Sequence, residues 1–326
     1  MRDAYERHLA GVTPGLYESQ YLKANSPAND QAFWIKHNLL VPPEGGGVGE
    51  FWLIWFQRGE APRVWKREVP AERLQLETTR IGLTGDQFRL DAQGCAGKIG
   101  DASWQLGFSG GLAPLFHFGS ERFYTASFPR KKLLTPAPNL QFDGTIELGD
   151  RRIDVARWIG LRGHNWGREH AFAYAYGGCN VWDDGATDRV VDGFTARVRL
   201  VAGMLSPWMS GVVFRDGARE VDHNRKRDWF ARGAVVEPRH WHVPYRDFSL
   251  DMEAGSEPYV GLRYRHPDGR ESYCYNTKFA AVTVDDGARR HTSSSGELEV
   301  LYSHPLPGVA LHPSESWTQR DGDYHS

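Results

Sequence analysis

Eight consecutive residues, from Gly163 to His170, carry the densest group of reactive side chains in the sequence. The run Gly-His-Asn-Trp-Gly-Arg-Glu-His offers two imidazoles, an amide, an indole, a guanidinium and a carboxylate. Side chains of this kind are costly to bury without partners and are not needed on a surface. We therefore expect the wall of a site rather than a core strand, with His164 as acid or base and Asn165 orienting a water or a ligand oxygen. The alternative is a polar corner whose side chains bond one another.

A second group of candidate residues lies near the N-terminus, between residues 17 and 39. Glu18 stands among tyrosines, and a carboxyl group packed among aromatic rings favours its neutral acid form, which could protonate a substrate. If the second half of this segment is a strand, His37 faces one side with apolar neighbours, and Trp34 and Asn38 face the other. His37 could then line a ligand cavity inside a barrel. The alternatives are a hydrogen-bonded core histidine and a surface carboxylate.

These two groups supply the predicted site. The residues expected to transfer protons are His164, Glu18 and His37. The residues expected to contact a ligand are Asn165, Trp166, Tyr21, Lys23, Trp34, Asn38, His170, Tyr176 and Asn180.

Three other motifs have simpler explanations than catalysis. Residues 107–111 match the G-x-S-x-G pattern of serine hydrolases, but Pro114 follows and no helical period does, so the required strand-turn-helix is absent. The glycine-rich segment 44–49 lacks the Lys-Ser/Thr of a phosphate loop, which favours a solvated hairpin loop. His240 and His242 would share one face of a strand, yet no third ligand stands at a recognised spacing. We therefore expect no metal site.

The elements that must position these residues are predicted to be strands. The chain holds 12 Trp, 13 Tyr and 16 Phe, and aromatic residues favour strands. Seven Asp-Gly pairs, which favour tight hairpin turns, punctuate it at positions 143, 184, 192, 216, 268, 286 and 321. The segments with the best strand patterns are residues 31–41, 50–57, 141–148, 152–161, 193–201 and 273–284.

The predicted fold class is therefore all-β, with antiparallel strands in barrels or sandwiches and a single short helix at residues 2–9. In the segment 141–148, Asp143-Gly144 is expected to be the turn of a strand-turn-strand unit. A length of 326 residues suggests two domains, which we place at residues 1–160 and 161–326. Such a boundary would put the Gly163–His170 run at a junction, where sites often lie.

Composition excludes several classes of protein. The net charge is −2 without a basic stripe, which argues against a nucleic-acid partner. The three cysteines are far apart in the sequence, so neither a disulfide framework nor a cysteine zinc site is indicated. No stretch has the apolar length of a membrane span, and the first twenty residues do not resemble a signal peptide. We expect a cytoplasmic protein that binds a small molecule and could form a homodimer.

Several motifs together resemble a known family. They are Tyr-Glu-x-x-Tyr-Leu-Lys-Ala-Asn from Tyr17, Ala-Phe-Trp-Ile-Lys from Ala32, and Gly-His-Asn-Trp-Gly-Arg-Glu-His from Gly163. With the supporting stretches 128–136 and 275–278, this pattern resembles the lipocalin-like superfamily of carotenoid 1,2-hydratase, also called hydroxyneurosporene synthase, which is similar to tocopherol cyclase and to fungal decalin-type hydratases and cyclases.

The resemblance implies two lipocalin-like β domains and an activity on a lipophilic, often isoprenoid, small molecule without an organic cofactor. Hydratase-type members tend to have Asp before the histidine of the His-x-Trp-Gly motif. Here that position is Gly163, so a different proton donor is needed, and His164 and Glu18 are the obvious substitutes.

The expected reaction is acid–base chemistry at a carbon–carbon double bond of an isoprenoid- or polyketide-like compound. Protonation would form a carbocation, which aromatic faces stabilise by roughly 0.5 to 2 kcal/mol each. A water held by Asn165 or Asn38 would give hydration, whereas loss of a neighbouring proton to His164 would give isomerisation or dehydration. Cyclisation is a third outcome. The alternatives are a non-catalytic carrier of a lipophilic ligand and, more weakly, a carbohydrate-binding protein with an exposed aromatic platform.

Overall fold

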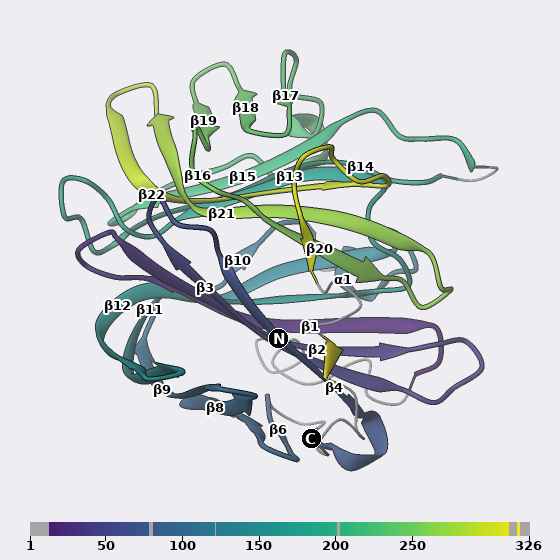
Figure 1. The fold of residues 1–326 in the computed structure, drawn as a ribbon. Coiled ribbons are helices and arrows are strands. Elements are labelled where there is room, and N and C mark those ends of the chain that lie inside the picture. Colours follow the sequence, from purple (N-terminus) through teal and green to yellow (C-terminus); the bar gives the residue numbers. More distant parts are fainter. Residues whose placement is uncertain (1–12, 78–80, 121, 201–202, 313–317, 320–326) are drawn as a thin grey trace.

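A computed structural model describes residues 13–77, 81–120, 122–200, 203–312 and 318–319. Almost all of the regular structure is strand, arranged in two curled sheets that lie one above the other (Figure 1). The described helical segments are short: α1 (Arg122–Thr125) and the 3-10 turns Ala71–Arg73 and Lys226–Asp228. The all-β fold class predicted from the sequence is confirmed.

The first sheet has 13 strands among the described residues, antiparallel except where β24 runs parallel to β4. In spatial order they are β24 (Thr318–Gln319), β4 (Arg63–Pro70), β3 (Val48–Gln57), β2 (Gln31–Val41), β1 (Leu16–Asn25), β12 (Arg151–Gly167), β11 (Lys131–Leu148), β9 (Ala102–Gly110), β8 (Gly94–Ile99), β7 (Phe88–Leu90), β6 (Leu83–Gly85) and β5 (Gln75–Leu76), with β10 (Leu115–Phe116) beside β11.

The second sheet has 11 strands among the described residues, antiparallel except for the pair β20 and β23. In spatial order they are β16 (Arg219–Asp222), β15 (Met209–Asp216), β14 (Arg189–Arg197), β13 (Ala173–Cys179), β22 (Arg290–Tyr302), β21 (Glu271–Asp285), β19 (Ser249–Glu253), β18 (His240–Pro244) and β17 (Val235–Val236), with β20 (Val260–Arg265) between β21 and β23 (Leu311–His312).

Three apolar layers follow from the period of two in these strands. One core fills the hollow of the first sheet, with side chains such as Phe33, Phe51 and Trp104. A second core fills the hollow of the second sheet. A third apolar cluster, which includes Trp34 and Tyr176, lies between the two sheets because their outer faces pack on each other. The central strands of each sheet are therefore buried on both faces.

The Asp-Gly pairs predict only some of the turns. The pairs that lie in connections between strands are those at positions 184, 216, 268 and 286. Asp143-Gly144 and Asp192-Gly193 lie inside strands, so the turn predictions there are wrong. Asp143-Gly144 forms a bulge in β11, where Asp143 Oδ1 accepts a hydrogen bond from the backbone N–H of Arg157 at 2.9 Å. The actual turn follows β11 at Gly149.

Most of the predicted strands are present, with shifted ends. The segment 31–41 coincides with β2, and 50–57 and 273–284 fall within β3 and β21. The segment 193–201 is displaced, because β14 runs from Arg189 to Arg197. The expectation that the Gly163–His170 run is not a core strand is wrong for its first half, since β12 continues to Gly167. The helix predicted at residues 2–9 and the Asp-Gly pair at 321 lie outside the described residues.

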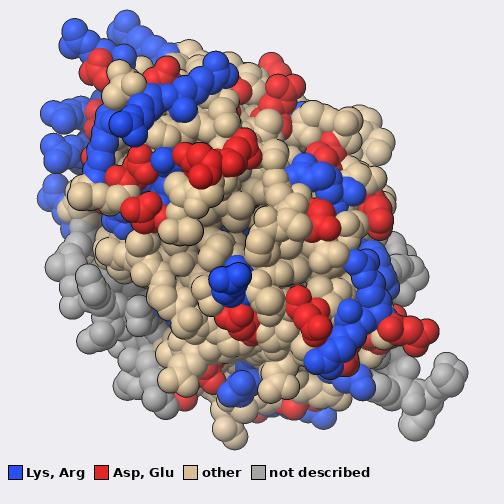
Figure 2. Space-filling model, turned by 90° about the vertical axis from the view of Figure 1, so that its left-hand side faces the viewer, with Lys and Arg blue, Asp and Glu red and all other residues tan. Residues whose placement is uncertain are grey.

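The chain passes from one sheet to the other between Gly167, the end of β12, and Ala173, the start of β13. The division into domains 1–160 and 161–326 stays a prediction. None of the described helices is both long and apolar enough for a bilayer. On the face drawn in Figure 2, blue and red side chains are interspersed, and no stripe of one charge crosses it.

Candidate functional site

A large cavity lies between the outer faces of the two sheets. Its volume is about 120 Å³. Its walls are mainly aromatic and aliphatic, and Phe128, which is 40% exposed, also lines it. The polar residues that line it are Tyr17, Glu18, Ser19, Tyr21, Lys36, Asn38, Glu50, Lys131, Asn165, His170, Tyr174, Tyr176, Tyr264, Arg265 and Glu299.

Strand alternation divides the predicted site residues between two compartments. Along β1, Tyr17, Ser19 and Tyr21 face the cavity, while Gln20 and Leu22 face the core of the first sheet. In β12 the cavity side holds Asn165, and the register pairs it with Ser19. We call these two sides of the first sheet the cavity face and the inner face.

A row of polar side chains crosses the cavity face. Ser19 of β1 is paired in register with Asn38 of β2 on one side and with Asn165 of β12 on the other. Ser19 Oγ, Asn38 Oδ1 and Asn165 Oδ1 are buried and have no hydrogen-bond partner in the described structure. Buried polar atoms are nearly always paired with protein, water or ligand. This row therefore has the chemistry to hold a water or a polar group of a ligand, as predicted for the two asparagines.

Two lysines also line the cavity. Lys36 Nζ donates to Tyr264 OH at 2.6 Å and lies 4.6 Å from the Trp34 ring centroid. Lys131 Nζ lies 4.0 Å from the centre of the Tyr174 ring. Burial lowers the pKa of each lysine to about 8. Neither lies in an ion pair among the described residues.

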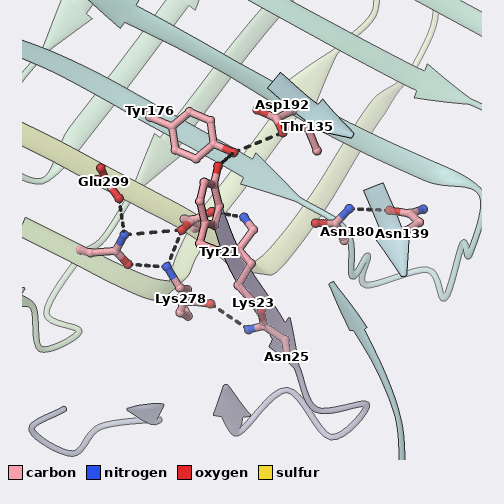
Figure 3. Close-up of polar contacts among 12 residues, drawn as sticks. Tyr21, Lys23, Asn25, Thr135, Asn139, Tyr176, Asn180, Asp192, Lys278 and Glu299 are labelled. Carbon is pink, nitrogen blue, oxygen red and sulfur yellow. Dashed lines mark hydrogen bonds and ion pairs between the residues drawn. The ribbon is translucent and has the colours of Figure 1, made fainter. Parts of the chain in front are cut away.

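A chain of hydroxyl groups connects the cavity to a buried carboxyl group (Figure 3). Tyr21 OH hydrogen-bonds Tyr176 OH at 3.2 Å, and Tyr176 OH donates to Asp192 Oδ2 at 3.2 Å. Thr135 Oγ1 donates to the same oxygen at 2.7 Å. Burial raises the pKa of Asp192 to about 7, whereas the nearby His117 is neutral because burial lowers its pKa to about 3. A carboxyl group poised near neutral pH is suited to general acid catalysis.

The Tyr21 ring fits in its position because residue 163 is a glycine and has no side chain. A Cβ atom at position 163 would lie 1.9 Å from Tyr21 Cζ and 2.3 Å from its hydroxyl oxygen. The phenol therefore occupies the volume that any side chain at this position would need. Where the resemblance led us to expect an aspartate, this chain has a glycine covered by a tyrosine hydroxyl.

Behind these residues, a network of buried charges joins the two sheets. Lys23 of β1 forms an ion pair with Glu297 of β22, which also binds Lys278 of β21. Glu299 Oε2 accepts a hydrogen bond from Asn276 at 3.1 Å. Lys23 thus lies at the sheet interface rather than among the cavity-lining residues, and its contacts fix the two sheets relative to each other (Figure 3).

Strand alternation places the side chains of the three residues predicted to transfer protons on the inner face, although Glu18 also borders the cavity. His164 Nε2 lies 2.9 Å from Glu18 Oε1, and both side chains are buried. Trp166 packs against His164, with ring centroids 4.5 Å apart. His37 contacts Phe51, at 5.2 Å between ring centroids, and belongs to the same interior. Tyr17 and Tyr21 project to the opposite face, so they do not surround the Glu18 carboxyl group. The catalytic roles of these three residues stay predictions.

Of the remaining residues predicted to contact a ligand, three line the cavity and one does not. Trp34, His170 and Tyr176 line the cavity, and His170 packs on Tyr17 with ring centroids 4.1 Å apart. Asn180 does not, because its amide binds Asn139 at the edge of the interface.

The discounted motifs have structural explanations. His240 Nε2 and His242 Nδ1 bond the same oxygen of Asp251, at 2.9 and 3.0 Å. The structure, as far as it is described, contains no group of three or more His, Cys, Asp or Glu residues arranged to hold a metal. Residues 107–110 end the strand β9, and no helix follows.

Sequence reasoning missed Lys36, Lys131 and Asp192. Lys36 could have been found, because strand alternation places it on one face with Trp34 and Asn38. Asp192 was hidden by its glycine neighbour, which favoured a turn. Lys131 is one of two adjacent lysines, and only the observed register shows which of them faces the cavity.

Comparisons with known proteins address the fold. No protein-family model matches the chain, and neither does the sequence of any curated protein. A crystal structure from Nitrosomonas europaea, of a protein described provisionally as AttH, superposes with a TM-score of 0.61 at 14% identity, over 87% of this chain and 91% of that one. This chain shares its fold.

Two further solved structures agree with this result. Kievitone hydratase from Nectria haematococca gives a TM-score of 0.53 at 9% identity, over 87% of this chain and 88% of that one. CghA, solved with Sch210972, gives 0.52 at 9% identity, over 88% of each chain. The fold that the sequence resemblance implies is therefore confirmed.

Proposed function

We propose that this protein is a cofactor-independent enzyme that protonates a carbon–carbon double bond of a lipophilic small molecule bound between the two sheets. The observation that supports this most directly is the hydrogen-bonded chain from Asp192 through Tyr176 to Tyr21, which ends at the wall of an aromatic cavity. Fold likeness to a protein named as a hydratase also supports it.

The proton would reach the substrate by a relay. Burial raises the pKa of the Tyr21 and Tyr176 hydroxyls well above the usual value, so neither phenol is a good acid alone. The hydroxyl hydrogens must first turn toward the cavity, so that neutral Asp192 donates to Tyr176 and Tyr176 donates to Tyr21. Tyr21 then gives its proton to the substrate carbon and takes one from Tyr176, and Tyr176 takes one from Asp192. The π electrons form the new C–H bond, and the negative charge remains on Asp192, within the field of Lys23.

The cation formed in this way has three fates. Aromatic rings of the cavity wall, such as Trp34 and Phe194, stabilise it while it lasts. A water on the row of Ser19, Asn38 and Asn165 would add to it and give hydration. Loss of a neighbouring proton would give isomerisation, and attack by a second double bond would give cyclisation. Each path returns one proton, which restores neutral Asp192.

The pair His164 and Glu18 is the competing proton donor. Strand alternation places both side chains on the inner face, although Glu18 also borders the cavity. We prefer the relay on the cavity face because its chain of hydrogen-bonded groups ends at Tyr21 in the cavity wall.

A deuterium experiment tests the proposed function. Native mass spectrometry followed by solvent extraction of freshly purified protein would identify a bound compound. That compound is then incubated with the protein in D₂O. We expect deuterium to appear on carbon at a rate that depends on the protein, and a Tyr176→Phe variant to lose that rate. A ligand that binds tightly and never acquires deuterium would make the protein a carrier instead.

A further inference from the structure

We propose that the molecule bound in the cavity is a lipophilic carboxylic acid, held as its anion by Lys36 and Lys131. This inference deepens the proposed function and rests on it, because it assumes that the cavity between the sheets holds the substrate. Nothing in the comparisons assigns a charge to the ligand.

The two ammonium groups lie in the wall of the cavity and face the second sheet. Lys36 Nζ is 3.9 Å from the ring centroid of Tyr264, and Lys131 Nζ is 4.0 Å from that of Tyr174. The side chain of Lys36 is almost completely buried, and Lys131 is partly buried. Aromatic rings offset only a small part of the cost of removing an ammonium group from water.

Glu50, one of the carboxylates that line the cavity, is already paired with other cations. Glu50 binds Lys66 at 2.9 Å and Arg265 at 2.6 Å. Glu68 binds the same two cations, each at 2.7 Å. These four side chains carry equal numbers of positive and negative charges, so the group as a whole supplies no net negative charge to the cavity lysines.

The other charged side chains in and behind the cavity include more lysines than glutamates. Glu297 is shared by two buried lysines behind the cavity, Lys23 and Lys278. Glu299 is the anion that raises the pKa of both Lys36 and Lys131 most strongly. It already accepts hydrogen bonds from Tyr174 and Asn276.

The pKa directions fit a shortage of anions. Despite Glu299, burial holds the pKa of each cavity lysine below its usual value. Cys274 is a thiol under these conditions, because burial raises its pKa well above the usual value. His170, also in the wall, is neutral because burial lowers its pKa. A negative charge on a ligand would reduce this excess, since buried charges need a partner.

The walls and the size of the cavity indicate which kind of molecule could carry the carboxylate. Its aromatic and aliphatic wall suits an apolar chain, and its volume of about 120 Å³ suits a short one. The relay hydroxyl of Tyr21 and the lysines lie in the same cavity. A bound acid would thus be oriented by its carboxylate, with part of its apolar chain beside the proton donor.

Calorimetric titration with two matched probes tests this inference. Geranic acid and geraniol share one isoprenoid chain, and only the acid is charged at pH 7. We expect the native protein to bind geranic acid at least about tenfold more tightly than geraniol, because only the acid supplies the missing charge. Lys36→Met and Lys131→Met should each remove most of this preference. Lys98→Met, at an exposed position on β8, should keep it.

Each result has a distinct meaning. Equal affinity of the native protein for the acid and the alcohol overturns this inference and leaves the proposed function intact. This comparison needs no variant, so it stands even if a substitution prevents folding. A preference that survives in both lysine variants also overturns it. Failure of both probes to bind in the millimolar range would count against the cavity as a lipophilic site, and thus against the proposed function itself.

Discussion

The two faces of the first sheet use the same strands for different purposes. On the inner face, the buried side chains of Glu18 and His164 bond each other, and His164 packs on Trp166. On the cavity face, Ser19 and Asn165 lie one residue further along the same two strands, and their buried oxygens lack partners in the described structure. The first pair is satisfied by the protein, whereas the second needs something that the protein does not supply.

This difference teaches how to recognise a site in a molecule full of buried polar groups. A buried polar group that is satisfied by its neighbours adds to the specificity of the fold. A buried polar group without a partner beside a cavity lowers the stability of the fold. Such a group is expected where a bound ligand supplies the missing hydrogen bond. By this criterion the cavity face, and not the inner face, is the functional one.

The substitution expected to lower turnover most is one that replaces Asp192, the acid of the relay. Asp192→Asn keeps an oxygen that can accept from Thr135 and Tyr176 but removes the proton. We expect turnover to fall about 10²- to 10⁴-fold. In the native protein, turnover should decline as the pH rises through about 7, because the protonated form of Asp192 is the active one. A pH–rate profile of the native protein that is flat from pH 6 to 8 would contradict this role.

The effect of Asp192→Asn on folding stability should depend on pH in a predictable direction. The pKa of Asp192 is raised on folding from its usual value to about 7, so the folded state binds the proton more tightly. The stability that this contributes is fully present below the unfolded pKa and is lost as the pH rises through about 7. At pH 8, Asp192→Asn should therefore melt no lower than the native protein.

A smaller effect is expected where the cavity face is most crowded. Gly163→Ala would place a Cβ 1.9 Å from Tyr21 Cζ, and overpacking of this kind costs about 1–3 kcal/mol. Thermal melting should show the loss, and Tyr21→Ala should relieve most of it. The matched control is Gly107→Ala in β9, where the nearest atom would be 3.8 Å away. Equal losses at the two glycines would show that Tyr21 is not what makes position 163 special.

The smallest effect is a gain in stability. Lys36→Met replaces a buried ammonium group that is short of anions with an apolar side chain of similar length. We expect the variant to gain about 1 kcal/mol of stability at pH 7, which raises its melting temperature by about 1–2 °C. The pKa of Lys36 is lowered to about 8 on folding, so the native protein gains stability as the pH rises from about 8 to its usual lysine value, and the advantage of the variant should shrink. A lower melting temperature at pH 7 would show that the bond to Tyr264 matters more.

The all-β fold class could be predicted from the sequence because the patterns that indicate it lie in short, local segments. Aromatic-rich alternating segments and Asp-Gly turns predicted an all-β chain, and β2 was placed correctly at both ends. The same rules failed at Asp192-Gly193, where a local turn signal competes with pairing to strands on both sides, and tertiary pairing decides.

The site could be predicted only in part. Sequence proximity grouped His164 with Asn165 and Glu18 with Tyr21, but strand alternation sends the members of each pair to opposite faces. Which face meets the second sheet depends on packing between elements more than 100 residues apart, such as Tyr21 and Tyr176. Alternation alone cannot tell which of two buried faces is the functional one.

The central claim is that proton transfer takes place on the cavity face. Its most direct test is turnover per folded molecule, as deuterium incorporation in D₂O, for Tyr176→Phe and His164→Gln, with thermal melting in parallel. We expect Tyr176→Phe to lose at least about 10²-fold in turnover and to melt close to the native protein. His164→Gln should lose about 1–3 kcal/mol of stability, because the bond between the imidazole and Glu18 is disrupted, and should keep turnover within about threefold once folded. The opposite result, an active Tyr176→Phe and an inactive but stable His164→Gln, would contradict the account and place the chemistry on the inner face.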